Sequence, residues 1–191
     1  PTLNIDTLTI TAGQLVNGVI QGCAEDTLNF CFDLKSTYPL AVLVPSDNST
    51  ISLPGATVTY QNTLTDSIRA CVTWPTTILD TGLHVLTITV KDSSCQPPGF
   101  LITNTFSITI NINPITKAFG DTSICTGDSA PLSVYGGSSF TWTALPGGSG
   151  IGSLSCTNCN NPIASPTVTT SYVVTSNLSS ICNQSTDTVT V

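Results

Sequence analysis

Charge and methionine are both scarce in this chain. Of its 191 residues only 8% are charged, and none is methionine. An ordinary soluble protein is about 25% charged. The eleven acidic residues are opposed by only four cations, Lys35, Arg69, Lys91 and Lys117. Because nucleic-acid binding needs clustered basic side chains, these scattered cations predict no nucleic-acid partner.

Long apolar runs are absent as well. No stretch approaches the roughly 18 apolar residues that a membrane-spanning helix needs, so we expect no membrane span. Neutral polar groups must then cover the surface, and Thr, Ser and Asn are abundant. Thr is favoured on the exposed faces of strands. Helical periodicity is missing too, and the sequence therefore predicts an all-β protein.

Alternating apolar and polar residues mark the strands of the first half. The segment 28–34, LNFCFDL, has the period of two that a strand with one buried face requires. Short turns rich in Pro, Gly, Asp and Asn separate such segments. The predicted strands are 8–10, 28–34, 40–44, 57–61, 68–74, 83–90 and 105–112. Seven strands over about 110 residues is the size of an immunoglobulin-like (Ig-like) β-sandwich.

A domain boundary is predicted at Asn113-Pro114. Proline cannot donate a hydrogen bond to a sheet, and it restricts the residue before it. The strand pattern then restarts at 123–125, 131–135, 140–143, 172–175 and 186–191. We expect two tandem Ig-like β-sandwiches, residues 1–113 and residues 114–191, the second small enough to need disulfides. Cysteine and tryptophan recur at corresponding points of both halves, which indicates a divergent internal repeat.

The eight cysteines with a single histidine favour disulfides over zinc, and disulfides indicate an oxidising, extracytoplasmic compartment. Cys31 and Cys71 each alternate with apolar residues, so both point away from the core. We expect them to form a disulfide if their strands are antiparallel neighbours. Elimination then pairs Cys23 with Cys95. An Ig topology puts these two at opposite ends, so long loops must reach, or another connectivity holds.

The Cys156-Thr157-Asn158-Cys159 motif has three readings. A redox motif needs a following helix to activate its thiol, and none is predicted. A zinc knuckle needs a second such motif or histidines, which are absent. A local disulfide Cys156–Cys159 remains, which leaves Cys125 to pair with Cys182.

Catalysis is not predicted. His84 is the only histidine, and no serine lies in a G-x-S-x-G segment, so no Ser-His-Asp triad is expected. The glycine-rich stretch 147–152 lacks phosphate-binding spacing and precedes no helix. Glu25 is the only glutamate, and most aspartates lie in turn sequences, which argues against paired catalytic carboxylates. We expect the chain not to be an enzyme.

Calcium is the metal that the composition suits best, because hard cations take carboxylate and carbonyl oxygens from loops. Its weak candidate ligands are Glu25, Asp26 and Asp92, although no D-x-D-x-D-G run is present. We therefore assign no cofactor and keep calcium as the alternative. Trp74 and Trp142 are expected in the cores, and Asn161 to Ser171 is expected to aim Tyr172 and Val174 into the second core.

Two sets of residues resemble a known group of surface proteins. In the second half these are SICTGDS at 123–129, FTW at 140–142, NPIASPTVTTSYVV at 161–174, and Cys182. In the first half they are ACVTWPT at 70–76 and DTGLHV at 80–85. They resemble the cadherin-like and Ig-like (PKD-like) repeats of large type IX-secreted cell-surface adhesins of gliding Bacteroidetes-type bacteria. Several acidic calcium ligands of true cadherins are missing here, and Cys31 and Cys71 are not general in the cadherin-like domains.

The resemblance implies a structural or adhesive segment of a large secreted surface protein or filament, located at the cell surface. Its partners would be neighbouring repeats of the same polypeptide, further copies, or cell-surface glycans. Both ends of the chain are expected to be cuts from a longer polypeptide. The alternative is a non-catalytic carbohydrate-binding accessory module of a secreted hydrolase. Such a module needs exposed aromatic side chains, for which Tyr38, Phe100 and Phe119 are the candidates. For Phe119, which lies at the domain junction, core or inter-domain packing is the favoured interpretation.

Overall fold

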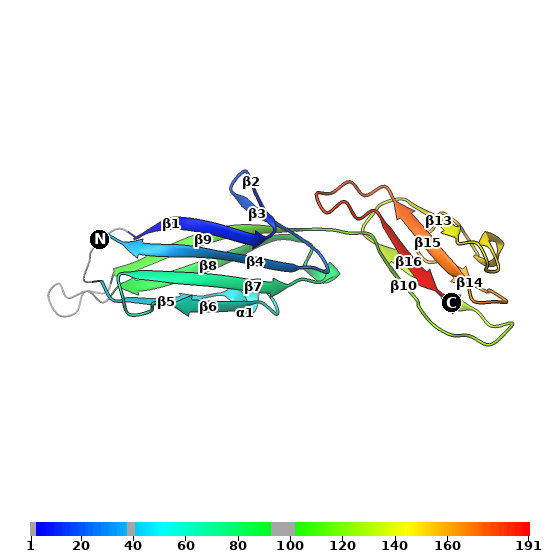
Figure 1. Cartoon of the computed structure of the whole chain (residues 1–191), viewed down its shortest axis with the longest axis horizontal. Coiled ribbons are helices and arrows are strands. Elements are labelled where there is room, and N and C mark those ends of the chain that lie inside the picture. Colours follow the sequence, from blue (N-terminus) through cyan, green and yellow to red (C-terminus); the bar gives the residue numbers. More distant parts are fainter. Residues whose placement is uncertain (1–2, 38–40, 93–101) are drawn as a thin grey trace. The chain divides into compact units, whose positions relative to one another are not determined.

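The computed structural model describes residues 3–37, 41–92 and 102–191. The chain folds into two compact units, Pro1–Asn113 (unit 1) and Pro114–Val191 (unit 2), the same residues as the two predicted domains. Both units are built from β-strands (Figure 1). Helical structure in the described residues is limited to single turns, at α1 (Ser49–Ser52), η1 (Ile78–Asp80) and η2 (Ile151–Ser153). The all-β prediction is confirmed.

One layer of unit 1 is a four-stranded antiparallel sheet in the order β1-β4-β7-β6. Its strands are β1 (Leu3–Ala12), β4 (Thr27–Ser36), β7 (Ser67–Pro75) and β6 (Thr57–Gln61). The two central strands, β4 and β7, bury alternate residues along most of their length. This is the arrangement that their period-two sequences predicted, because successive side chains of a strand point to opposite faces.

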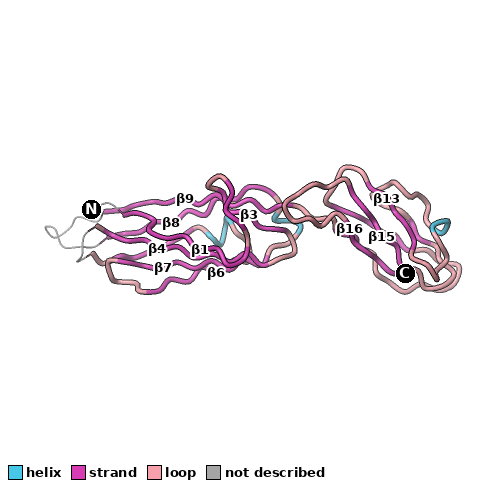
Figure 2. Tube along the Cα trace, turned by 45° about the horizontal axis from the view of Figure 1, so that its top comes forward, coloured by secondary structure: helices cyan, strands magenta, loops and turns pink. Residues whose placement is uncertain are grey.

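The other layer of unit 1 is a five-stranded sheet in the order β2-β3-β9-β8-β5. Its strands are β2 (Gln14–Val16), β3 (Val19–Cys23), β9 (Ile102–Asn113), β8 (Gly82–Asp92) and β5 (Leu43–Asp47). Only the β3–β9 pair of this sheet is parallel. In chain order the first sheet reproduces A-B-E-D, and β9, β8 and β5 reproduce G-F-C, which is the Ig topology (Figures 1 and 2).

The core of unit 1 lies between these sheets. Trp74 of β7 is fully buried, its ring lies 4.9 Å from that of His84 of β8, and its Nε1 donates to the carbonyl of Pro54. Burying a large apolar side chain contributes about 1.5–3 kcal/mol. The other largest fully buried side chains of the unit are Phe30, Phe32, Ile20, Leu34, Leu43, Leu53, Ile68, Leu86 and Ile88.

Unit 2 combines a three-stranded sheet with two short ribbons. The sheet has the order β13-β15-β16, from β13 (Phe140–Ala144), β15 (Ser171–Ser176) and β16 (Thr186–Thr190). The ribbons pair β10 (Lys117–Phe119) with β12 (Ser133–Tyr135), and β11 (Ala130–Pro131) with β14 (Ile163–Ala164). Trp142, Tyr172 and Val174 are buried at the centre of its core, as the sequence predicted.

Two local predictions differ from the structure, and one hairpin was not predicted. Residues 43–47 form a strand, although Pro45 is typical of turns; β5 is an edge strand, where a missing N–H is tolerated. Residues 123–125 form no strand. The β2–β3 hairpin was not predicted, although Asn17-Gly18 carries its signal: both residues have the positive φ, 51° and 79°, that a type I′ turn needs.

Candidate functional site

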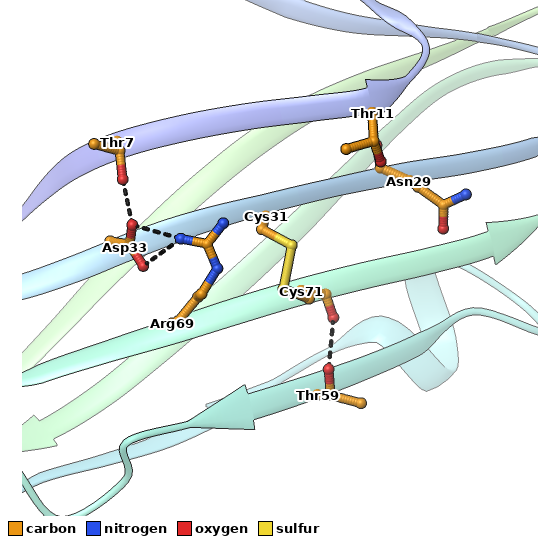
Figure 3. The surroundings of a disulfide bond; sticks show 8 residues. All are labelled: Thr7, Thr11, Asn29, Cys31, Asp33, Thr59, Arg69 and Cys71. Carbon is orange, nitrogen blue, oxygen red and sulfur yellow. Dashed lines mark hydrogen bonds and ion pairs between the residues drawn. A yellow bond between two sulfur atoms is a disulfide. The ribbon is translucent and has the colours of Figure 1, made fainter.

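A disulfide joins the two central strands of the four-stranded sheet (Figure 3). Cys31 of β4 and Cys71 of β7 are directly opposite in the register, their Cα atoms are 4.1 Å apart, and they are bonded. Their neighbours along each strand, Phe30, Phe32 and Val72, are buried, so the bond lies on the outer face of the sheet. A parity argument is sufficient to place both cysteines there.

Polar side chains surround this disulfide. Two positions along the ladder, and so on the same face, Asp33 of β4 is opposite Arg69 of β7. Arg69 Nη1 lies 2.9 Å from Asp33 Oδ2 and 3.1 Å from Oδ1, and Thr7 of β1 donates to the same carboxylate. On the other side, the Thr59 hydroxyl of β6 donates to the carbonyl of Cys71 over 3.4 Å. Side-chain contacts therefore link all four strands across this outer face (Figure 3).

A second disulfide closes a tight loop in unit 2. Cys156 and Cys159 are bonded, with 6.0 Å between their Cα atoms. The loop is attached to buried Trp142 at two points: the Trp142 N–H donates to the Thr157 carbonyl over 2.8 Å, and its Nε1 donates to the Cys159 carbonyl over 2.9 Å. The bond thus fixes a loop that satisfies both donors of a core tryptophan.

The remaining cysteines depart from expectation in part. Cys125 is exposed and free, so the expected Cys125–Cys182 bond is wrong; Cys182 is itself disulfide-bonded. The elimination that led to it assumed that every cysteine is bonded. Cys23 is disulfide-bonded as well, but Cys95 lies outside the described residues. Because the bonded Cys182 also needs a partner, the Cys23–Cys95 pair no longer follows by elimination.

The three candidate calcium ligands are not brought together. Gly82 begins β8 and pairs with Ile112 of β9, and the next residue of β9 pairs with Cys23 of β3. Glu25 and Asp26 follow Cys23 closely in the chain, so they lie near the Gly82 end of β8. Asp92 ends the same 11-residue strand, which spans roughly 35 Å. These three residues therefore do not form one cluster. Within residues 3–37, 41–92 and 102–191 no group of three or more His, Cys, Asp or Glu side chains could hold a metal ion.

His84 has a structural environment. Its Nδ1 lies 3.0 Å from the carbonyl oxygen of Ser52, and its Nε2 lies 2.7 Å from that of Asp80. The two ring nitrogens therefore meet two backbone acceptors, and the ring packs against Trp74. The Asp80 carboxylate is itself used in the capping box of η1, where it accepts from the N–H and hydroxyl of Thr77. These contacts provide no nucleophile for a catalytic base.

A carboxylate and a tyrosine connect the two sheets of unit 1 at their edges. The Tyr60 hydroxyl of β6 donates to Asp47 Oδ2 of β5 over 2.6 Å, and the Ser49 N–H donates to Oδ1 over 2.9 Å. Burial acts to raise the pKa of Asp47, but the hydrogen bonds from Ser49 and Tyr60 outweigh it and hold the pKa below its ordinary value. Burial, and then the hydrogen bond to Asp47, raise the pKa of Tyr60.

Open clefts occur in unit 2. One of about 580 Å³ follows β13 and the glycine-rich loop after it, and reaches Thr157. Another of about 350 Å³ lies between the segments 122–126 and 166–169 and the last two residues. Neither is lined by a charged residue or a histidine, so neither offers acid-base or metal chemistry.

Exposed aromatic side chains gather on unit 2. Of the three candidates, Tyr38 and Phe100 lie outside the described residues. Phe119 is 39% exposed and is not part of the core of unit 2, so the favoured core packing is wrong for it. Its ring meets that of Tyr135, which is 55% exposed and which sequence reasoning did not single out. The sequence carries a signal for this in its alternation: apolar Val134 lies between Ser133 and Tyr135, so a strand that buries Val134 turns Tyr135 outward.

No family model matches this chain. No curated protein matches it either. Among solved structures, the mouse nectin-like molecule 4 ectodomain aligns over 97% of this chain and 62% of its own, at 12% identity and a TM-score of 0.37. A tandem from titin aligns over 97% of this chain and 65% of its own, at 15% identity and a TM-score of 0.29. Domains 5–6 of the S-layer protein SbsC align over 100% of this chain and 97% of their own, at 14% identity and a TM-score of 0.30.

These likenesses are too low in TM-score to support an argument, and the Ig-like assignment rests on the strand order of unit 1. The chain spans less than two thirds of the nectin-like and titin structures. No described helix is long and apolar enough to cross a membrane.

Proposed function

We propose that this chain is a structural and adhesive segment of a large secreted surface protein, in which Ig-like units space and stiffen an array of repeats. The observation that carries the proposal is the Cys31–Cys71 bond on the outer face of a sheet. Disulfides persist in oxidising compartments, so a solvent-facing bond between central strands fits an extracellular protein.

The connection between the units supports a spacing role. The Asn113 side chain donates to Gln21 and to the carbonyl of Gly22, and its carbonyl accepts from Ala24, all within unit 1. The next residue, Pro114, accepts at its carbonyl from Ser180 of unit 2. Asn113 is therefore held within unit 1 and Pro114 within unit 2.

Three described residues with catalytic potential are engaged in structural contacts. His84 faces two carbonyls, Asp80 caps a helical turn, and Asp33 pairs with Arg69. We therefore propose a non-enzymatic role, with neighbouring repeats of the same polypeptide as the first partners.

The test is surface labelling together with the full-length sequence. A membrane-impermeant biotin reagent applied to intact cells should label the protein, and further β-sandwich repeats should adjoin this segment. Labelling only after lysis would contradict the extracellular role. A single adjoining catalytic domain would contradict the array.

A further inference from the structure

The outer face of the β10–β12 ribbon displays two aromatic rings. Phe119 of β10 is 39% exposed and Tyr135 of β12 is 55% exposed. Their centroids are 5.8 Å apart at an interplanar angle of 79°, an edge-to-face pair. Each ring therefore holds the other in place while keeping part of its surface open to solvent.

The strand register and a required glycine fix this pair. In both strands the middle residue, Ala118 or Val134, is buried, which turns the residues on either side outward. The Ala118 N–H donates to Asp187 Oδ2 over 2.8 Å, which anchors β10. Directly after Tyr135, Gly136 has φ +87°, and a Cβ there would lie 1.8 Å from the carbonyl oxygen of Ile115. The backbone therefore fixes the positions of the two rings.

Polar groups flank the rings without adding net charge. Lys117, on the same outer face, pairs across the ribbon with Tyr135, and its Nζ lies 3.8 Å from Asp187 Oδ2. The two charges compensate each other. A net charge of −7 on the whole chain disfavours an anionic ligand, and the compensated Lys117–Asp187 pair leaves the face itself without net charge, which suits an uncharged ligand.

We propose that this face, formed by Lys117, Phe119, Ser133 and Tyr135 with Asp187, binds neutral glycans through a pyranose ring. A pyranose has an apolar C–H face, which stacks on an aromatic ring, and a rim of hydroxyls, which bond to flanking charged and hydroxyl groups. A few placed polar groups beside apolar surface are typical of small-ligand sites. The inference goes beyond the spacing role and rests on it only in placing unit 2 outside the cell, where glycans are available.

Affinity electrophoresis tests this inference on the whole chain. The probes are soluble arabinoxylan, mixed-linkage β-glucan, galactomannan and dextran, each cast into a native gel, with alginate as the charged comparison. At least one neutral polysaccharide should retard the protein, and alginate should not. Phe119→Ala and Tyr135→Ala should each weaken retardation about tenfold, the effect of losing one stacked ring. Tyr135→Phe, which keeps the ring, should retain most of it.

Val168→Ala is the matched control, because Val168 is as exposed as Tyr135 and lies in the same unit. It should not change retardation. Near-ultraviolet circular dichroism checks the fold of both units, since each contains a buried tryptophan, Trp74 in unit 1 and Trp142 in unit 2. No retardation by any neutral probe overturns the proposal, as does equal retardation of wild type and both ring variants. Either result leaves surface labelling and the repeat context unaffected, so the two proposals fail separately.

Discussion

Removing the Cys31–Cys71 bond should destabilise unit 1 selectively. The bond closes a loop with a sequence separation of 40. In the chain-entropy relation a loop of that length restricts the unfolded chain by about 13 cal/mol/K, or about 4 kcal/mol at 25 °C. Any further disulfide that encloses the same segment would lower this figure, because the unfolded chain would already be constrained. The Cys31→Ser/Cys71→Ser double variant should lose several kcal/mol of unfolding free energy.

Each unit carries one buried tryptophan, which makes the measurement specific. With Trp142→Phe, fluorescence during urea unfolding reports Trp74 and hence unit 1; with Trp74→Phe it reports unit 2. Cys156→Ser/Cys159→Ser is the matched control. Its sequence separation of 3 gives a loop-entropy loss of only about 1.6 kcal/mol, and this loss falls on unit 2.

Two outcomes would refute this reasoning. One is a loss of less than about 1 kcal/mol in unit 1 at an unchanged slope against urea, because the loop entropy would then be absent. The other is an equal shift of the Trp142 transition, because the bond would then act outside its own unit.

Three further predictions follow from local contacts. Asp47→Asn should lower the free energy of unfolding at neutral pH. Because folding lowers the pKa of Asp47, the ionised carboxylate stabilises the protein above the ordinary pKa of 3.8, and this stabilisation is lost as the pH falls through the folded pKa. Acid denaturation curves of wild type and variant should therefore converge at low pH. An equal difference at pH 2 and pH 7 would contradict this. Gly136→Ala should destabilise unit 2 by at least about 2 kcal/mol, since its Cβ would overlap the Ile115 carbonyl; an unchanged Trp142 urea midpoint would refute it. Residues 1–113 expressed alone should fold, giving dispersed amide resonances in NMR, whereas a collapsed spectrum would show that the division at Asn113 is not a domain boundary.

Much of the fold was predictable because strands encode their burial locally. The alternation in 28–34 and 68–74 is sufficient to determine which residues enter the core, and it also turns Cys31 and Cys71 outward. In the structure these two lie directly opposite each other and are bonded. Such parity needs no knowledge of distant partners.

The features that the sequence did not predict are not encoded locally. Each depends on distances between segments far apart in the chain. Elimination could not show that Cys125 remains free. Charge alone could not show that Asp92 ends the strand whose other end lies near Glu25. The pairing of Phe119 with Tyr135 required the register of β10 against β12, which two three-residue strands do not specify by pattern alone.

The crosslink between β4 and β7 also has a mechanical consequence. When tension is applied at the chain ends, a covalent bond carries the load directly from Cys31 to Cys71, and the segment between them bears none. With a sequence separation of 40, that segment withholds about 13–14 nm of contour length from an unfolding event. A surface protein built from such units would lengthen less under shear, and a ruptured unit would keep a folded-back segment from which to re-form.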